Sequence, residues 1–99
     1  MVEEKSKLLV IDDDRSIRKV LTVTLRDAGY EVLTAEDGES GLKIFAEEGP
    51  EIVLCDLRMP GMDGISVLKE IKARDPEKEV IVITAYADMD LAVKALQLK

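Results

Sequence analysis

The sequence of 99 residues contains no histidine, no tryptophan and only one cysteine, Cys55. The absence of histidine excludes imidazole catalysis and histidine-ligated metal sites within this sequence. A single cysteine cannot form an internal disulfide, and because Cys55 lies inside an apolar run, we interpret it as a small core residue. Aromatic residues make up only 3% of the chain, so we expect an aliphatic core.

Clusters of basic residues are also missing. The chain has 14 Lys and Arg against 21 Asp and Glu, which gives a formal net charge of −7. Nucleic acids and acidic membranes are recognised through clustered Lys and Arg, so we expect no direct contact with nucleic acid or membrane. No apolar segment near the N-terminus resembles a signal peptide or a membrane span, which predicts a cytoplasmic protein. The length suits one domain with one core.

Short runs of apolar and β-branched residues predict four strands, at 7–11, 30–34, 52–56 and 80–84. Runs without polar alternation are typical of strands that are covered on both faces of a sheet. Apolar residues at three- and four-residue steps predict helices between the strands: 15–28, from Asp37-Gly38 to Gly49-Pro50, from Asp63 to about Asp75-Pro76, and a last one from near Asp88 or Asp90. The predicted apolar faces comprise Ile17, Val20, Leu21, Leu25 and Ala28 in the first helix and Ile65, Leu68 and Ile71 in the third.

This alternation of strands and helices predicts an α/β fold, a doubly wound parallel sheet with helices on both faces. The carboxyl ends of parallel strands meet at one edge of a sheet. We therefore expect convergence of four side chains that follow or end strands: Asp12, Asp13, Asp56 and Thr84. Asp14 is interpreted as the N-cap of the first helix.

Asp56 is the candidate reactive group because it ends a central apolar strand and precedes Met59-Pro60-Gly61, a loop that cannot continue the strand. An Asp in this place can also simply begin a turn, and its convergence with Asp12 and Asp13 is what favours chemistry. Two carboxylates about 5 Å apart repel by roughly 3 kcal/mol at an effective dielectric constant of about 20. Mg²⁺, which prefers oxygen ligands, would relieve this repulsion. A carboxylate beside the metal can attack a phosphoryl group and form an aspartyl phosphate.

Three segments with compatible spacing also carry a family resemblance: 9–13, Asp56 with 59–64, and 81–85. Together they resemble the receiver (phosphoacceptor) domain of two-component response regulators, over essentially the whole chain. The resemblance implies a flavodoxin-like sheet of strand order 2-1-3-4-5. It also implies that residues 1–99 form one receiver domain in phosphorelay signal transduction.

The resemblance implies a role for each residue at the site. Asp56 would accept a phosphoryl group from a phosphohistidine on a sensor histidine kinase or a phosphotransfer protein. The domain would promote its own phosphorylation and dephosphorylation as a switch and would not be an enzyme in the ordinary sense. Asp13, Asp56 and the backbone carbonyl of Arg58 would bind Mg²⁺, and Asp12 would act largely through a metal-bound water.

Two residues after the fourth strand complete the implied switch. The Thr84 hydroxyl would move onto the phosphoryl oxygen and shift the following loop and helix, which would control an output domain or partner. Ala85 would leave room for the phosphoryl group.

Receiver domains continue into a fifth strand that ends in a lysine and then into a fifth helix, whereas this sequence stops at Lys99. We therefore expect the domain to be incomplete at its C-terminus, with no residue in the role of that lysine. Residues 80–83 would then form an open apolar edge, which is a template for association. We therefore expect either that the natural chain continues beyond Lys99 or that two copies pair as a homodimer through the open edge of the sheet.

Three alternatives remain open from the residues alone. Segment 9–16 also fits the Asp-x-Asp-x-Ser/Thr pattern of haloacid-dehalogenase-like phosphatases, in which Asp12 would be the nucleophile, although such enzymes are longer and need a downstream lysine. A flavodoxin-like FMN-binding protein shares the topology, but three aspartates in its first loop would repel a phosphate. The last alternative is an interaction module that is not phosphorylated.

Overall fold

In the computed structural model, which describes residues 5–83, strands and helices alternate along the chain. The elements are β1 (Lys7–Ile11), α1 (Arg15–Asp27), β2 (Glu31–Ala35), α2 (Gly38–Glu48), β3 (Ile52–Asp56), α3 (Gly64–Arg74) and β4 (Glu79–Ile83). All paired strands are parallel, and their order across the sheet is β2-β1-β3-β4. The predicted order is confirmed for these four strands.

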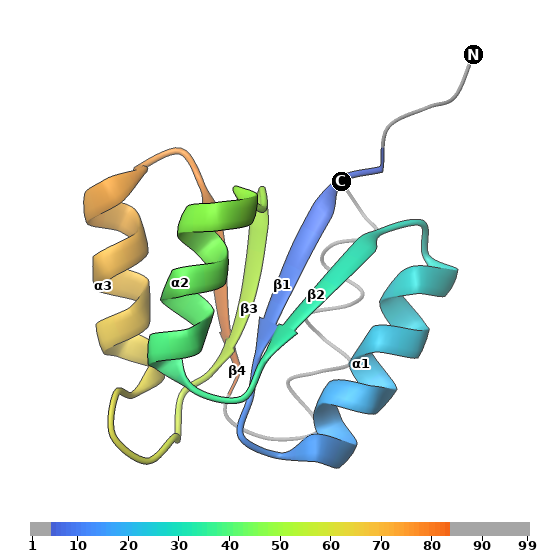
Figure 1. The fold of residues 1–99 in the computed structure, drawn as a ribbon, viewed down its shortest axis with the longest axis horizontal. Coiled ribbons are helices and arrows are strands. Elements are labelled where there is room, and N and C mark those ends of the chain that lie inside the picture. The colour runs from blue at the N-terminus through green and yellow to red at the C-terminus, as the bar shows by residue number, and fades with distance from the viewer. Residues whose placement is uncertain (1–4, 84–99) are drawn as a thin grey trace.

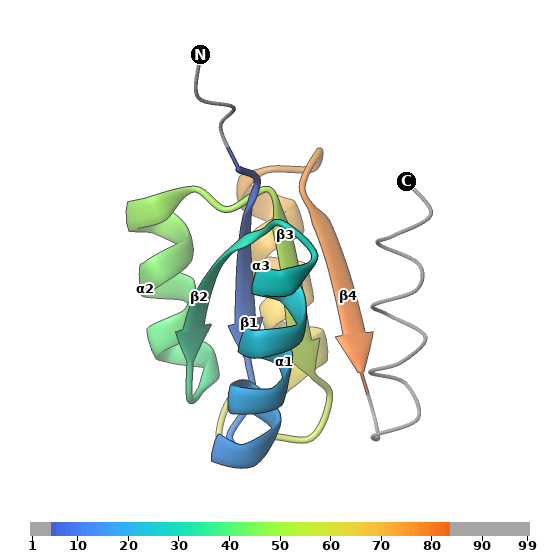
Figure 2. The ribbon, with the colours of Figure 1, turned by 90° about the vertical axis from the view of Figure 1, so that its right-hand side faces the viewer.

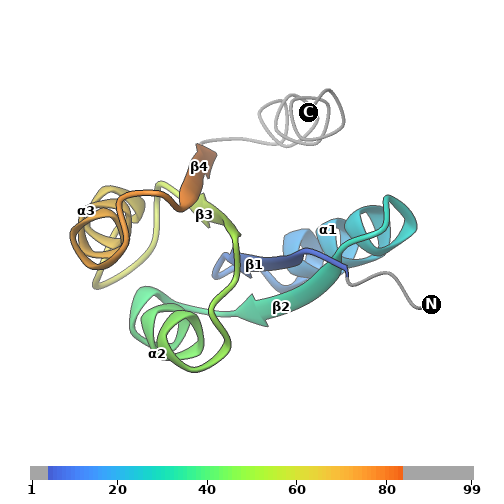
Figure 3. The same ribbon diagram turned by 90° about the horizontal axis from the view of Figure 1, so that it is seen from above.

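The helices cover both faces of the sheet, as the sequence predicted. Figure 1 and the view from above in Figure 3 show α1 on one face and α2 with α3 on the other. One core cluster joins Leu8 and Val10 of β1 to Leu21 and Leu25 of α1. The second cluster lies on the opposite face and contains Leu9, Ile11, Ala35, Leu42, Phe45, Val53, Cys55, Met59, Val67 and Ile71. Because successive side chains of a strand point to opposite faces, an uninterrupted apolar run supplies both clusters.

The helices α1, α2 and α3 each begin after an aspartate that accepts hydrogen bonds from backbone N–H groups of the first turn. Asp14 Oδ1 accepts from Ser16 at 2.8 Å and from Ile17 at 3.2 Å. Asp37 and Asp63 each cap their helix through one bond of 2.8 Å, from the N–H of Ser40 and of Ser66 respectively. Such caps satisfy N–H groups that have no partner inside the helix. The capping role predicted for Asp14 is confirmed, and the helices predicted to start at Asp37 and Asp63 begin there as well.

The start of β2 differs from the prediction by one residue. Tyr30 was expected in the strand, but its N–H donates to the Leu25 carbonyl at 3.1 Å and closes the end of α1. The strand therefore begins at Glu31, which pairs with Lys7 of β1. Backbone groups that a helix end uses are not available to a sheet.

The core-facing residues of two helices also differ from the prediction. In α3 the buried apolar residues are Val67 and Ile71, whereas Ile65 is 41% exposed. Gly64 packs tightly against the end of β3 and thereby sets the rotation of α3, which turns Ile65 away from the sheet. In α1, Val20 is 51% exposed while Leu21 and Leu25 are buried.

β4 pairs with β3 through residues 79–83 on one side, and among the strands of residues 5–83 none pairs with its other side. Two predicted site residues, Thr84 and Ala85, lie outside the described residues, and so does the predicted fourth helix. The homodimer through this edge stays a prediction.

Candidate functional site

The carboxyl ends of β1 and β3 bring three carboxylates together. The register pairs Ile11 with Cys55, so that the next residues, Asp12 and Asp56, leave the sheet as neighbours. One carboxylate oxygen each of Asp12, Asp13 and Asp56 lies within 4.8 Å of the other two. Figure 2 shows the strand arrows pointing toward this end of the sheet, where the β1–α1 and β3–α3 connections lie. The structure thus brings together the three aspartates that the sequence placed at this edge.

Asp12 is the buried member of the cluster, with only 1% of its surface exposed. Its Oδ1 accepts a hydrogen bond from the Asp14 N–H at 2.8 Å, but its Oδ2 has no hydrogen-bond partner among the described residues. Burial raises the pKa of Asp12 to about 6, and repulsion from Asp56 and Asp13 acts in the same direction. Buried polar oxygens normally have a partner, so Oδ2 is available to a cation.

Asp56 is half-buried at the end of β3, and Asp13 beside it is exposed. Asp56 Oδ1 accepts a hydrogen bond from the Arg58 N–H at 3.1 Å. Burial raises the pKa of Asp56 above its ordinary value, and repulsion from Asp13 adds to this, whereas the Arg58 N–H lowers it. Because Asp56 is half-buried and Asp12 is fully buried, Asp56 is the one of these two strand-end aspartates that a reactant from solvent can reach.

The β3–α3 loop holds Asp56 in place through close backbone packing. Met59 is 8% exposed and belongs to the core cluster under α2 and α3. Gly61 has φ +79°, a left-handed conformation that glycine adopts without strain. The Gly64 N–H donates to the Leu57 carbonyl at 3.2 Å. A Cβ at Gly64 would lie 2.5 Å from the Asp56 carbonyl oxygen, so only glycine allows α3 to start this close to the site.

The remaining predicted site residues are placed only in part. Arg58 is exposed, and its N–H donates to Asp56 Oδ1, so the metal-binding role of its carbonyl stays a prediction. Thr84 and Ala85 lie outside the described residues, although Ile83 directly before them pairs with Asp56 across β3 and β4.

The oxygen atoms of this cluster fit a hard divalent cation. Within residues 5–83, no Lys or Arg side chain forms an ion pair with Asp12, Asp13 or Asp56. The positive charge of Arg58 lowers the pKa of Asp56, but that pKa is still raised overall, so the mutual repulsion of the carboxylates is only partly balanced in the described part of the chain. Carboxylate oxygens with room for water suit Mg²⁺, whereas Zn²⁺ sites normally contain histidine or cysteine.

Sequence reasoning missed two contacts at this site. The close approach of Gly64 to Asp56 had only a weak signal, a glycine at the first position of a helix. The other is the Arg18 guanidinium, whose Nη1 donates to the Asp12 backbone carbonyl at 2.6 Å. No periodic pattern in the sequence indicates this second contact.

Comparison with known proteins agrees with this geometry. Residues 8–99 match the family described as "Response regulator receiver domain". The chain is 49% identical over 88 residues to the DNA-binding transcriptional regulator NtrC of Escherichia coli K12, which covers 89% of this chain and 19% of NtrC. The chain thus spans about a fifth of the length of this relative.

Two solved structures are similar over most of the chain. The response regulator TrrA of Thermotoga maritima, in complex with Mg²⁺ and BeF, has a TM-score of 0.79 and 35% identity, covering 93% of this chain and 80% of that one. A structure of the histidine kinase ThkA in complex with TrrA matches with a TM-score of 0.76 and 40% identity, covering 82% of this chain and 70% of that one.

Among residues 5–83, none of the helices has the length and apolar character that a membrane span requires.

Proposed function

Because the chain belongs to the receiver domain family of two-component response regulators, we propose that it is a phosphoacceptor switch whose reactive residue is Asp56. The observation that supports this most strongly is the cluster of Asp12, Asp13 and Asp56 at the carboxyl end of the sheet, with one buried oxygen that has no hydrogen-bond partner within residues 5–83. Within the cluster, Asp56 ends its strand, is half-buried and has one oxygen held by a backbone N–H.

Mg²⁺ is the cofactor that we propose for this cluster. Asp12, Asp13, Asp56 and the backbone carbonyl of Arg58 would hold the ion, Asp12 largely through a water. When bound, the ion offsets the negative charge of the carboxylates and of the phosphoryl oxygens. The TrrA structure with Mg²⁺ and BeF supports this choice of metal by similarity.

The reaction on Asp56 is a phosphoryl transfer that the chain promotes by positioning. A carboxylate oxygen of Asp56 forms the new P–O bond while the P–N bond to the donor imidazole breaks, and the imidazole leaves with the electron pair. The Arg58 N–H donates to Oδ1 of Asp56 and thereby fixes the orientation of the carboxyl group. Later attack by water on the phosphorus of the aspartyl phosphate breaks the P–O bond to Asp56, returns the carboxylate and releases inorganic phosphate, which ends the signal. The domain would thus act as a switch that promotes its own phosphorylation and dephosphorylation.

The remaining residues of the proposed switch follow β4. Thr84 would transfer the state of Asp56 to the rest of the protein, since its hydroxyl would bond to the phosphoryl oxygen, and Ala85 would leave space for that group. The register between Asp56 and Ile83 supports this, because Thr84 is the next residue along the chain.

We propose a sensor histidine kinase or a phosphotransfer protein as the donor, and an output domain or effector as the recipient of the signal. The complex of ThkA with TrrA supports the first proposal by similarity. The second is supported by NtrC, a DNA-binding regulator of which this chain matches about a fifth. Association of two copies through the side of β4 that pairs with no strand of residues 5–83 is a further proposal, which light scattering at micromolar concentration tests.

A phosphodonor assay tests the assignment of Asp56. The wild-type protein should be labelled by acetyl phosphate or by a phosphorylated kinase in the presence of Mg²⁺, and Asp56→Asn should abolish labelling. Asp37→Asn is the matched control, because Asp37 is an exposed helix cap on α2 and should leave labelling unchanged.

The opposite pattern would contradict the proposal. Labelling that persists in Asp56→Asn and disappears in Asp12→Asn would favour the phosphatase-like reading, with Asp12 as nucleophile. The 1% exposure of Asp12 argues against that reading, because a nucleophile must reach its substrate. No labelling of the wild type by any donor would favour an interaction module.

A further inference from the structure

Arg18 connects α1 to the turn that carries Asp12 and Asp13. Its Nη1 donates to the Asp12 backbone carbonyl at 2.6 Å, in a partly buried position. The other cations of α1 are Arg15, Lys19 and Arg26, all exposed, and none of them has a side-chain hydrogen bond or ion pair within residues 5–83. The contact is thus specific to one of four cations on the same helix.

The bond from Arg18 is one of three hydrogen bonds that hold Asp12 in place. The Asp12 N–H donates to the Ala35 carbonyl at 3.1 Å, which continues the pairing of β1 with β2. Its Oδ1 accepts from the Asp14 N–H, and its backbone carbonyl accepts from Arg18. Three of the four polar atoms of Asp12 are therefore held, and the one that remains is Oδ2 in the carboxylate cluster.

The carbonyl that Arg18 holds belongs to the peptide unit that joins Asp12 to Asp13. Fixing this peptide unit fixes the directions in which both side chains leave the backbone. A hydrogen bond from a guanidinium is charge-assisted and about twice as strong as a neutral one. Outer contacts of this kind orient the groups that bind a metal.

We propose that Arg18 is a positioning residue for the magnesium site: its guanidinium holds the Asp12 carbonyl and so directs the Asp12 and Asp13 carboxylates toward Asp56. The inference rests on the proposed function, because it presupposes that these carboxylates bind Mg²⁺. Arg18 does not itself touch the ion or the phosphoryl group.

The sign of one effect separates positioning from plain electrostatics. Removing any positive charge near an acidic cluster makes the cluster more negative, so by electrostatics alone Mg²⁺ should bind more tightly. Loss of a positioning contact has the opposite result, because the carboxylates lose their common direction. Arg18→Gln should therefore weaken Mg²⁺ binding, while Arg15→Gln removes the same charge from the same helix and should leave binding unchanged or slightly tighter.

Calorimetric titration of the metal-free proteins with MgCl₂ near neutral pH measures this difference. We expect Arg18→Gln to raise the Kd for Mg²⁺ on the order of ten-fold relative to wild type. Arg18→Lys keeps the charge and one donor group, so its Kd for Mg²⁺ should lie between those of wild type and Arg18→Gln. In NMR spectra without metal, the amide signals of residues 12–14 should shift in Arg18→Gln and stay in place in Arg15→Gln.

Each outcome decides the matter. Mg²⁺ affinity of Arg18→Gln equal to or tighter than that of wild type would overturn the positioning role and leave the proposed function intact. Should Arg18→Gln fail to fold, Arg18→Lys decides, and an affinity equal to wild type would overturn the role. A wild-type protein that binds no Mg²⁺ would overturn the magnesium site itself, and this role with it.

Discussion

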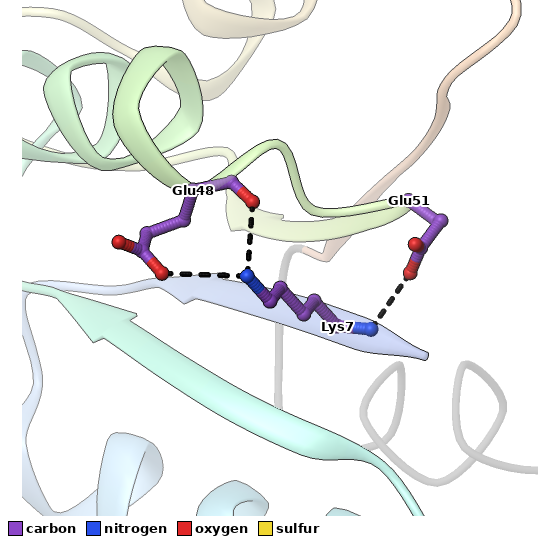
Figure 4. A network of polar contacts seen from close by, with 3 residues as sticks. All are labelled: Lys7, Glu48 and Glu51. Carbon is purple, nitrogen blue, oxygen red and sulfur yellow. Dashed lines mark hydrogen bonds and ion pairs between the residues drawn. The ribbon is translucent and has the colours of Figure 1, made fainter. Parts of the chain in front are cut away.

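Both ends of the sheet carry acidic side chains, but the two ends differ in whether a basic side chain pairs with them. At the amino end, the Lys7 N–H donates to Glu51 Oε2 at 2.7 Å, and Lys7 Nζ lies 3.4 Å from the Glu48 carbonyl oxygen and 3.5 Å from Glu48 Oε1 (Figure 4). At the carboxyl end, Asp12, Asp13 and Asp56 lie within 4.8 Å of one another, and no ion pair with them occurs in residues 5–83.

The charge at the amino end is paired within the fold, whereas the cluster at the carboxyl end has the carboxylates, unpaired within residues 5–83, that the proposed Mg²⁺ site requires. An ordinary fold balances its carboxylates where they meet, as Lys7 does for Glu48. Burying Asp12 with a free oxygen lowers the stability of the metal-free protein, and such a cost is typical of functional sites.

The largest expected effect comes from the packing that holds Asp56. Gly64→Ala places a Cβ 2.5 Å from the Asp56 carbonyl oxygen and 2.8 Å from the Leu57 Cα. We expect the free energy of unfolding to fall by on the order of 3 kcal/mol, because both neighbours are backbone atoms. Urea denaturation measures this value.

Ile65→Ala is the control for this change, since Ile65 is the next residue on α3 and is 41% exposed. Its effect should stay below about 1 kcal/mol. Similar losses in the two variants would show that the tight contact between Gly64 and β3 is wrong.

The second prediction concerns pH. The pKa of Asp12 is raised to about 6 in the folded protein, from an ordinary value of 3.8, mainly by burial. The folded state therefore binds the proton more tightly than the unfolded state. The resulting stabilisation is fully present below the ordinary pKa and is lost as the pH rises through about 6. Metal-free protein should lose up to about 3 kcal/mol of stability across this window.

Asp12→Asn removes this titration, so the stability of the metal-free variant should fall less with rising pH than that of wild type, and the remaining fall comes from Asp56, whose pKa is also raised by burial. Denaturation curves at several pH values, without Mg²⁺, compare the variant with wild type. A wild-type stability that rises through the same window would contradict the burial of a free Asp12 oxygen.

The smallest effect is expected at the amino end. Lys7→Met removes the ion pair with Glu48 but keeps the backbone bond to Glu51, and both side chains of the pair are at least a third exposed. The free energy of unfolding should fall by less than about 1 kcal/mol, and the loss should shrink at high salt. A loss as large as that in Gly64→Ala would contradict the contrast between the two ends.

Apolar runs and strand ends are local signals, and they were sufficient to predict the parallel sheet and the edge at which the aspartates meet. The order of the strands was predicted through the family resemblance. It misplaced Ile65, since the rotation of α3 depends on how closely Gly64 approaches β3, a contact between segments. The contact of Arg18 with the Asp12 carbonyl could not be predicted either. It depends on one side-chain conformation and leaves no periodic trace in the sequence.

The proposed metal site at the carboxyl end of the sheet is tested by the melting temperature of the protein with and without millimolar Mg²⁺, at near-neutral and at acidic pH. If the carboxyl end is a metal site, Mg²⁺ should stabilise the protein at near-neutral pH, by about 1.4 kcal/mol at ten times its Kd. The gain should vanish at acidic pH, where Asp12 is protonated, and should be smaller in Asp13→Asn. A melting temperature that Mg²⁺ leaves unchanged at near-neutral pH, or raises equally in Asp13→Asn, would contradict the account.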